Sequence, residues 1–224
     1  MVRRDEMRRA LIHVLRIAIG VTLLVVLPWR WVPPPTSAFM LGDRVTGTTV
    51  HHRWVGWEKI SPRLAVAVVA SEDQKFPTHH GFDFDSIAKA WRDTDGRRRG
   101  ASTISQQVVK NLYLWPGRSV VRKAIEAYLT GWIELLWPKR RILEIYLNIA
   151  EFGPGVYGAE AAAERLFGTS ARALTVEQAT LLAAVLPNPT ERSAARPSAS
   201  VRRRARAIQT QMRRLGGTAY LDAL

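Results

Sequence analysis

The most apolar part of the chain lies near its amino end. Residues 10–32 form a run that only one histidine and two arginines interrupt, with four arginines before it and two tryptophans at its far end. Basic residues on one side and tryptophans on the other match the two faces of a bilayer. A cleavable signal peptide is the alternative, but Pro28 stands where small residues would be needed. We therefore expect an uncleaved transmembrane helix over 10–32, a cytoplasmic tail over 1–9, and everything after Trp31 outside the cytoplasm.

Beyond this segment, the spacing of apolar and polar positions is mostly helical. A proline run at 33–35 opens a linker that we expect over 33–49, and the β-prone residues 46–50 are a candidate for a small hairpin. Serine or threonine caps, proline at a first helical position and a Thr175-x-x-Gln178 capping box mark the helix starts. The expected helices follow Ser61-Pro62, run from Asp85 to Trp91, open at Ser102 or Thr103, run from Ser119 to Pro138, cover 139–152 and 159–167, follow Thr175, and end at Gly216-Gly217.

These elements predict a mainly α fold. We place one helical domain at 50–190, with a basic loop at 97–99, and expect residues 191–224 to form a basic helical extension that packs on it. The chain has 224 residues, a formal net charge of +14 and no cysteine. The charge indicates an anionic partner such as nucleic acid, a membrane surface or a phosphate-bearing substrate. The lack of cysteine excludes disulfides, thiolate metal sites and cysteine nucleophiles.

Two adjacent acids, Glu72 and Asp73, follow directly on the apolar helix that begins at Pro62. A carboxylate withdrawn from water holds a proton more readily, which suits a general acid or base. A solvated helix end explains the same residues. His79 and His80 come next, but no third ligand stands at metal-site spacing, so a structural role is the better interpretation.

A polar stripe follows the helix that opens near Thr103. Its apolar residues share one face, whereas hydroxyl, amide and ammonium groups lie on the adjacent one. Such groups bind sugar hydroxyls and phosphates, although an ordinary amphipathic helix remains the alternative. The stripe consists of Thr103, Gln107, Lys110 and Asn111.

Arg122, Lys123 and Glu126 stand one helical turn apart. A surface ion-pair helix explains this spacing. The alternative is a cation cluster for a diphosphate, in which Glu126 orients the cations or holds a divalent metal.

The glycines of residues 153–158 fit G-x-G-x-x-G, but a dinucleotide fingerprint must follow a strand and here a helix precedes it. We therefore expect these glycines to permit a tight turn and close helix packing.

In this order, the motifs resemble those of the peptidoglycan glycosyltransferases. They are E-D-x-x-F-x-x-H-x-G from Glu72, G-x-S-T-I-x-Q-Q-x-x-K-N from Gly100, R-K-x-x-E from Arg122 and I-L-E-x-Y-L-N-x-x-x-F-G-x-G-x-x-G from Ile142. The resemblance covers residues 57–189. Two later runs, Leu186-Pro187-Asn188-Pro189 and residues 211–217, resemble the monofunctional biosynthetic members of the family, which carry no transpeptidase domain. The resemblance implies a lysozyme-like helical glycosyltransferase domain with a smaller membrane-facing lobe.

The resemblance also implies an activity. Lipid II is polymerised into β-1,4-linked glycan strands, with inversion at the donor's anomeric carbon and release of undecaprenyl diphosphate. Glu72 is then the general base on the acceptor's 4-hydroxyl, and Glu126 is the second catalytic residue, beside the cations. The remaining residues that the resemblance assigns to substrate binding are Asp73, Phe76, His79, Gly81, Ser102, Thr103, Gln107, Lys110, Asn111, Arg122 and Lys123.

The resemblance also implies the cofactors, partners and location of the protein. No cofactor is required, although Glu126 allows a divalent cation such as Mg²⁺ or Mn²⁺. The partners are lipid II, the growing glycan strand, the membrane and, among proteins, those of cell-wall synthesis or division. The location is the inner membrane, with a single span and a periplasmic catalytic domain.

Two other functions compete with this one. A lysozyme-like murein hydrolase or lytic transglycosylase also needs a glutamate near a glycan, but it has no need of Arg122 and Lys123. A membrane-tethered nucleic-acid-binding protein fits the charge, but the chain has no basic stripe interleaved with aromatic residues and no reader motif. We therefore expect no nucleic acid partner.

Overall fold

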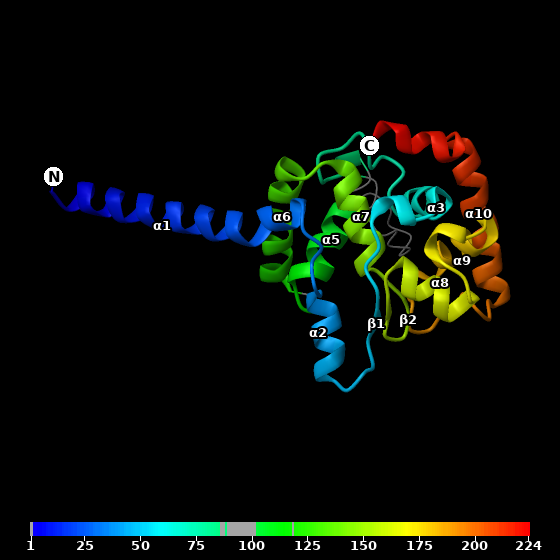
Figure 1. The fold of residues 1–224 in the computed structure, drawn as a ribbon. Helices are drawn as coiled ribbons and strands as arrows, with labels where there is room; N and C mark the ends of the chain where they lie inside the picture. Colours follow the sequence, from blue (N-terminus) through cyan, green and yellow to red (C-terminus); the bar gives the residue numbers. More distant parts are fainter. Residues whose placement is uncertain (1, 86–87, 89–101, 118) are drawn as a thin grey trace.

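The computed structural model describes residues 2–85, 88, 102–117 and 119–224, and it is mainly helical, as expected (Figure 1). The helix expected over 85–91 lies outside this description except for Asp85 and Ala88, which are helical, and the basic loop at 97–99 lies outside it entirely. The α-helices are α1 (Val2–Val26), α2 (Ala38–Val45), α3 (Pro62–Glu72), α5 (Ile104–Tyr113), α6 (Val120–Leu136), α7 (Lys139–Ile149), α8 (Ala159–Phe167), α9 (Val176–Val185) and α10 (Ala199–Arg214). Short 3-10 helices are η1 (Leu27–Arg30), η2 (Trp57–Lys59), η3 (Ala171–Ala173) and η4 (Gly217–Ala223).

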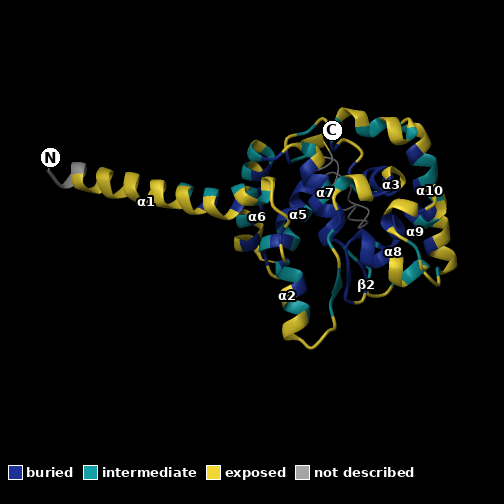
Figure 2. Cartoon of the chain, viewed as in Figure 1, coloured by how far each residue is buried: buried dark blue, intermediate teal, exposed yellow. Residues whose placement is uncertain are grey.

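Helix α1 projects from the body of the molecule (Figure 1). Within the described residues it belongs to the one segment, Glu6–Arg30, that is long and apolar enough to cross a membrane, with a mean hydropathy of 2.5 in its most apolar stretch of 18 residues. Residues 6–18 are exposed, and only the last turns touch the domain (Figure 2). The apolar run expected over 10–32 is therefore a helix that is exposed over its first turns, docks on the domain with its last turns and continues into η1.

The segment expected to be a linker, 33–49, contains a helix of its own. Ser37 accepts a hydrogen bond from the backbone N–H of Met40, which caps α2 at its start. This helix packs against α5. Residues 46–50, a candidate for a small hairpin, form no strand, and the first strand is β1 (His51–His52), directly after them.

The core is built around two buried helices. Helix α3 packs against α9, α10 and η4, and its residues Leu64–Ala70 are all buried. Helix α5 packs between α6 and α7. The dark interior in Figure 2 follows these helices, because their apolar residues recur on every side that meets a neighbour.

Local chemistry explains most of the helix starts. The side chains of Thr103 and Thr175 each form a reciprocal capping box with the glutamine three residues later. Ser119 caps α6, also as expected. Ser61 does not cap α3, because its hydroxyl donates instead to the carbonyl of Leu174 at 3.3 Å.

Helix α7 is shorter than the expected 139–152. It ends at Ile149, and the chain turns into β2 (Glu151–Gly153), which pairs antiparallel with β3 (Val156–Tyr157) in a small sheet of order β1-β3-β2. Gly158 closes this unit with a φ of +85°, and a Cβ there would lie 2.6 Å from the carbonyl oxygen of Asn148. The glycine-rich segment therefore does serve a tight turn and close packing, as its sequence context indicated.

Candidate active site

Glu72 is the last residue of α3, and its carboxylate is only 13% exposed. Ser71 donates to Oε1 at 2.8 Å and Gln107 donates to Oε2 at 3.1 Å. Arg204 of α10 lies 3.5 Å from Oε1. An ionised carboxylate can only accept hydrogen bonds, and three donor groups surround the carboxylate of Glu72.

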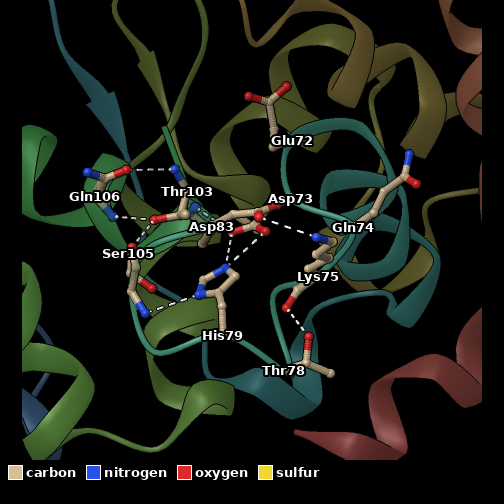
Figure 3. A network of polar contacts seen from close by, with 12 residues as sticks. Glu72, Asp73, Gln74, Lys75, Thr78, His79, Asp83, Thr103, Ser105 and Gln106 are labelled. Atoms are coloured by element: carbon tan, nitrogen blue, oxygen red, sulfur yellow. Dashed lines mark hydrogen bonds and ion pairs between the residues drawn. The ribbon is translucent and has the colours of Figure 1, made fainter. Parts of the chain in front are cut away.

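Asp73 faces the opposite way and serves the scaffold (Figure 3). One of its oxygens accepts the backbone N–H of Ile104 at 2.9 Å, and both lie within 3.0 Å of His79 Nε2. Because the N–H of Gly81 donates to Nδ1 of His79, the ring proton sits on Nε2 and points at Asp73. Asp73 thus ties the turn after α3 to the start of α5.

The turn below this pair is closed by small and buried residues. Gly81 has a φ of +86°, a Cβ there would lie 2.8 Å from Thr130, and its carbonyl accepts the Thr103 hydroxyl at 2.7 Å. Phe76 is fully buried, with the Lys139 ammonium 4.6 Å from its ring centre. Five residues expected to bind substrate therefore lie beneath the site and shape it: Asp73, Phe76, His79, Gly81 and Thr103.

Helix α5 presents Gln107 to the site, whereas Gln106 is used in the capping box. The Tyr146 hydroxyl donates to Oε1 of Gln107 at 3.1 Å, and this leaves the amide nitrogen facing Glu72. Burial raises the pKa of Tyr146 well above its ordinary value, and the charges of Glu72 and Asp73 act in the same direction. Tyr146 therefore stays protonated and fixes the orientation of the amide.

A cation cluster, which we define as Lys110, Arg122 and Lys123, surrounds Glu126. Glu126 is buried on α6, with one oxygen 3.0 Å from Arg122 Nη1 and the other in contact with Lys123 Nζ. Burial lowers the pKa of Lys110, the charges of Arg122 and Lys123 act in the same direction, and the charge of Glu126 opposes them. An anion bound here would relieve that cost.

One buried donor of the cation cluster is unused. Arg122 is 8% exposed, and its Nε has no hydrogen-bond partner among the described residues. An unpaired buried N–H costs about 1–3 kcal/mol, and an acceptor atom of a bound ligand would remove that cost. Lys123, by contrast, is half exposed and reaches the surface of the site.

The described residues do not fit a divalent cation at Glu126. Its two oxygens already contact Arg122 and Lys123, and Lys110 adds a third positive charge nearby. Nowhere in the described ranges do three histidine, aspartate or glutamate side chains gather as a metal site would need.

The binding roles of all these residues remain predictions, and the same holds for Ser102 and Asn111. Ser102 is exposed just before α5, and Asn111 is half-buried next to Lys110.

The structure also adds residues that the sequence did not single out for the site. Arg204 reaches Glu72 from a helix rich in arginines, and nothing in the spacing distinguishes it from its neighbours. Glu134 is buried and contacts Ser105 and Lys139, which braces α5 against α6. Tyr146 stood within a motif, but its bond to Gln107 needs the packing of α5 on α7 to be known.

Gln107, which contacts the enclosed carboxylate of Glu72, and Lys110 of the cation cluster are one helical turn apart on α5. A carboxylate shielded from water near buried cations indicates a class of protein, an enzyme that acts on an anionic substrate. Comparison with known proteins identifies the family. A family model described as transglycosylase matches residues 41–213. The chain belongs to this family.

Named relatives agree over nearly the whole chain. It is 50% identical over 223 residues to a biosynthetic peptidoglycan transglycosylase of Xylella fastidiosa (strain M23), covering 96% of this chain and 92% of the relative. It is 52% identical over 226 residues to the protein of that name from Pseudomonas savastanoi pv. phaseolicola, covering 97% and 95%. With the one from Chromohalobacter salexigens the identity is 50% over 233 residues, covering 99% of both.

Proposed function

We propose that this protein polymerises lipid II into the glycan strands of peptidoglycan. One observation carries the proposal: α5 joins the two halves of the site. Gln107, which contacts Glu72, and Lys110, which belongs to the cation cluster, are three residues apart on this helix. Their backbone positions are separated by a rise of about 4.5 Å along the helix axis.

In the proposed reaction, Glu72 accepts the proton of the acceptor's 4-hydroxyl. The hydroxyl oxygen forms a bond to the anomeric carbon of the donor while the bond from that carbon to the diphosphate oxygen breaks. Attack from the face opposite the leaving group inverts the centre from α to β, as in an inverting glycosidase with a sugar hydroxyl in place of water.

The leaving group is an anion, so it requires positive charge more than a proton. The ammonium of Lys110, the free Nε of Arg122 and the exposed part of Lys123 supply that charge. Glu126 holds two of these cations in place, since they would otherwise repel each other. We assign it this role and not proton transfer, because both its oxygens are occupied.

The cation cluster separates this proposal from a murein hydrolase or a lytic transglycosylase. Cleavage between two sugars releases an alcohol, which needs a proton donor and not a set of cations. Buried cations around one glutamate therefore favour a diphosphate leaving group.

The proposal also includes the orientation of the protein in the membrane. One apolar amino-terminal helix supports attachment to a membrane. We place its amino end in the cytoplasm, because arginines precede it, and the catalytic domain in the periplasm. Partners among cell-wall synthesis or division proteins remain a prediction of the family resemblance.

The test is polymerisation of purified lipid II by the full chain in detergent, with products resolved on a gel. We expect polymer from the parent, and a loss of about 10²–10⁴-fold in rate for Glu72→Gln, which keeps the shape but cannot accept the proton. Glu58→Gln, at an exposed ion pair with Arg140, is the matched control and should polymerise normally. Cleavage of finished murein without any polymer from lipid II would contradict the proposal.

A further inference from the structure

The end of the anchor helix is held by side chains of the catalytic domain. The last carbonyls of a helix have no partner within it, so they need donors from elsewhere. Trp137 Nε1 donates to the carbonyl of Val26 at 3.1 Å. Arg141 donates to the carbonyls of Trp29 and Val32, both at 2.8 Å. We call Trp137, Arg141 and Tyr128 the anchor clasp.

Tyr128 joins the clasp through a polar contact on the side of α1. Its hydroxyl lies 3.0 Å from that of Thr22, which is 7% exposed although it belongs to an apolar helix. The docked residues Ile19, Thr22, Leu23 and Val26 recur at helical spacing, so one stripe of the last two turns meets the domain. The turns before them remain free for lipid.

Helix α6 connects the clasp to the cation cluster. Arg122 and Glu126 are buried toward α5, whereas Tyr128, two residues further, faces α1. Arg141 also donates to Glu144 at 2.7 Å, and Glu144 accepts the backbone N–H of Trp57 at 2.9 Å. The clasp is therefore continuous with the buried framework of the domain.

We propose that the anchor clasp makes α1 and the catalytic domain one rigid body, so that the anchor sets the height and tilt of the cation cluster above the membrane. Trp137 and Arg141 are then positioning residues. The consequence for turnover rests on the proposed function, since a lipid-linked diphosphate sits at the level of the headgroups. A loose tether would present the cation cluster at many heights.

The first test measures the docking itself. The chain has no cysteine, so Ile17→Cys on α1 and Ala207→Cys on α10 allow two spin labels to be placed selectively. Pulsed EPR on the full chain in lipid nanodiscs should give one narrow distance distribution. The distribution should broaden with Trp137→Phe, which removes one donor at nearly constant volume, and more so with Trp137→Phe and Arg141→Gln combined. Arg140→Gln is the matched control, because Arg140 is on the same helix and contacts Glu58 and Trp57 but not the anchor.

The second test compares lipid II polymerisation in vesicles and in detergent. The clasp variants should lose about tenfold to a hundredfold in vesicles, the usual cost of a misplaced reacting group. In detergent, where no membrane surface fixes the height, they should stay near the parent. A broad distribution in the parent, or an equal loss in both media, would overturn the inference. Failure of the parent to polymerise lipid II would refute the proposed function, while the distance measurement would still judge the docking.

Discussion

At the scale of single residues, the site depends on which way one amide points. Gln107 can turn its oxygen or its nitrogen toward Glu72, and the Tyr146 hydroxyl selects the nitrogen. Tyr146→Phe should lower kcat roughly tenfold, because a buried hydrogen bond is worth about 1–1.5 kcal/mol and its loss frees the amide to turn. The measurement is steady-state polymerisation together with thermal unfolding. An unchanged kcat would show that the amide is held by other contacts.

For Asp73 we expect a substitution to lower the stability of the fold and not the turnover of the folded enzyme. It accepts the N–H groups of Ile104 and His79 and is 7% exposed, so Asp73→Asn places an amide among donors. We expect a loss of about 1–3 kcal/mol in the free energy of unfolding, measured by denaturant titration, with activity falling only as the fold is lost. Normal stability with abolished turnover would instead move Asp73 into the chemistry.

The sequence predicts the site residues that stand in motifs, but not those that only the packing of the helices brings to the site. Glu72, Gln107 and Lys110 stand in motifs whose order is informative. Arg204 could not be recognised, since it lies 132 positions from Glu72 and among similar arginines, and only the packing of α10 on α3 brings the two together. The division of Asp73 from Glu72 likewise depends on a side-chain direction that spacing does not give.

At the scale of elements, α5 carries a pH dependence. Burial lowers the pKa of Lys110, so its ammonium exists below that lowered value and is lost as pH rises through it. Binding of the diphosphate should weaken over the same range, and kcat/KM should decline at a lower pH than an ordinary lysine would cause. Lys110→Arg, which remains charged, should move this alkaline limb upward even if its overall rate is lower. Lys59→Arg, on the exposed η2, is the control and should leave the pH profile of kcat/KM unchanged. An unchanged pH profile in Lys110→Arg would contradict this explanation.

The junction between α7 and α8 makes an element-scale prediction about stability. In Gly158→Ala the new Cβ would lie 2.6 Å from a backbone oxygen, at a φ of +85°. We expect a loss of more than about 2 kcal/mol in the free energy of unfolding. Gly168→Ala is a matched comparison, because Gly168 also has a positive φ, +63°, but nothing lies within 4 Å of its Cβ position. It should cost only about 1 kcal/mol. Equal losses for both variants would mean that the close approach to Asn148 relaxes freely.

Elements were predictable where capping chemistry was local. The capping box at Thr175 and the helix over 159–167 lie where the sequence placed them, and α5 is capped by Thr103, one of its two expected starts. Helix α2 was not predicted, because the proline run at 33–35 indicated an extended linker. The helix packs against α5, a contact that the sequence does not show. The end of α7 was misjudged because residues 151–153 pair with β3, a choice that helical spacing does not reveal.

At the scale of the whole molecule, exposed apolar side chains gather on the helices beside the anchor. Leu41 and Val45 of α2, and Val120, Val121 and Leu135 of α6, are all exposed. Both helices lie at the end of the domain from which α1 projects (Figure 1). This distribution supports the expected membrane-facing lobe, since such patches on one face mark a contact with lipid or protein.

The orientation of the chain across the membrane gives the last prediction. A reporter that is active only in the periplasm should be active when fused after Leu224, because the arginines before the span stay inside. The same reporter fused after Arg9 is the control and should be silent. A silent carboxy-terminal fusion, with the protein present in the membrane, would reverse the topology and remove access to lipid II on the outer face.

Helix α5 has a consequence for inhibitors. Its first turn is fastened by Asp73 and Thr103, and the next presents Gln107 and then Lys110. The spacing between Gln107, which contacts the proposed base, and Lys110, which belongs to the cation cluster, is therefore set by one helix. A compound that joins a hydroxyl-bearing ring to a diphosphate mimic must match that spacing with its own linker. Stiff linkers of the right length should gain affinity, and flexible ones should lose it to the entropy of being ordered.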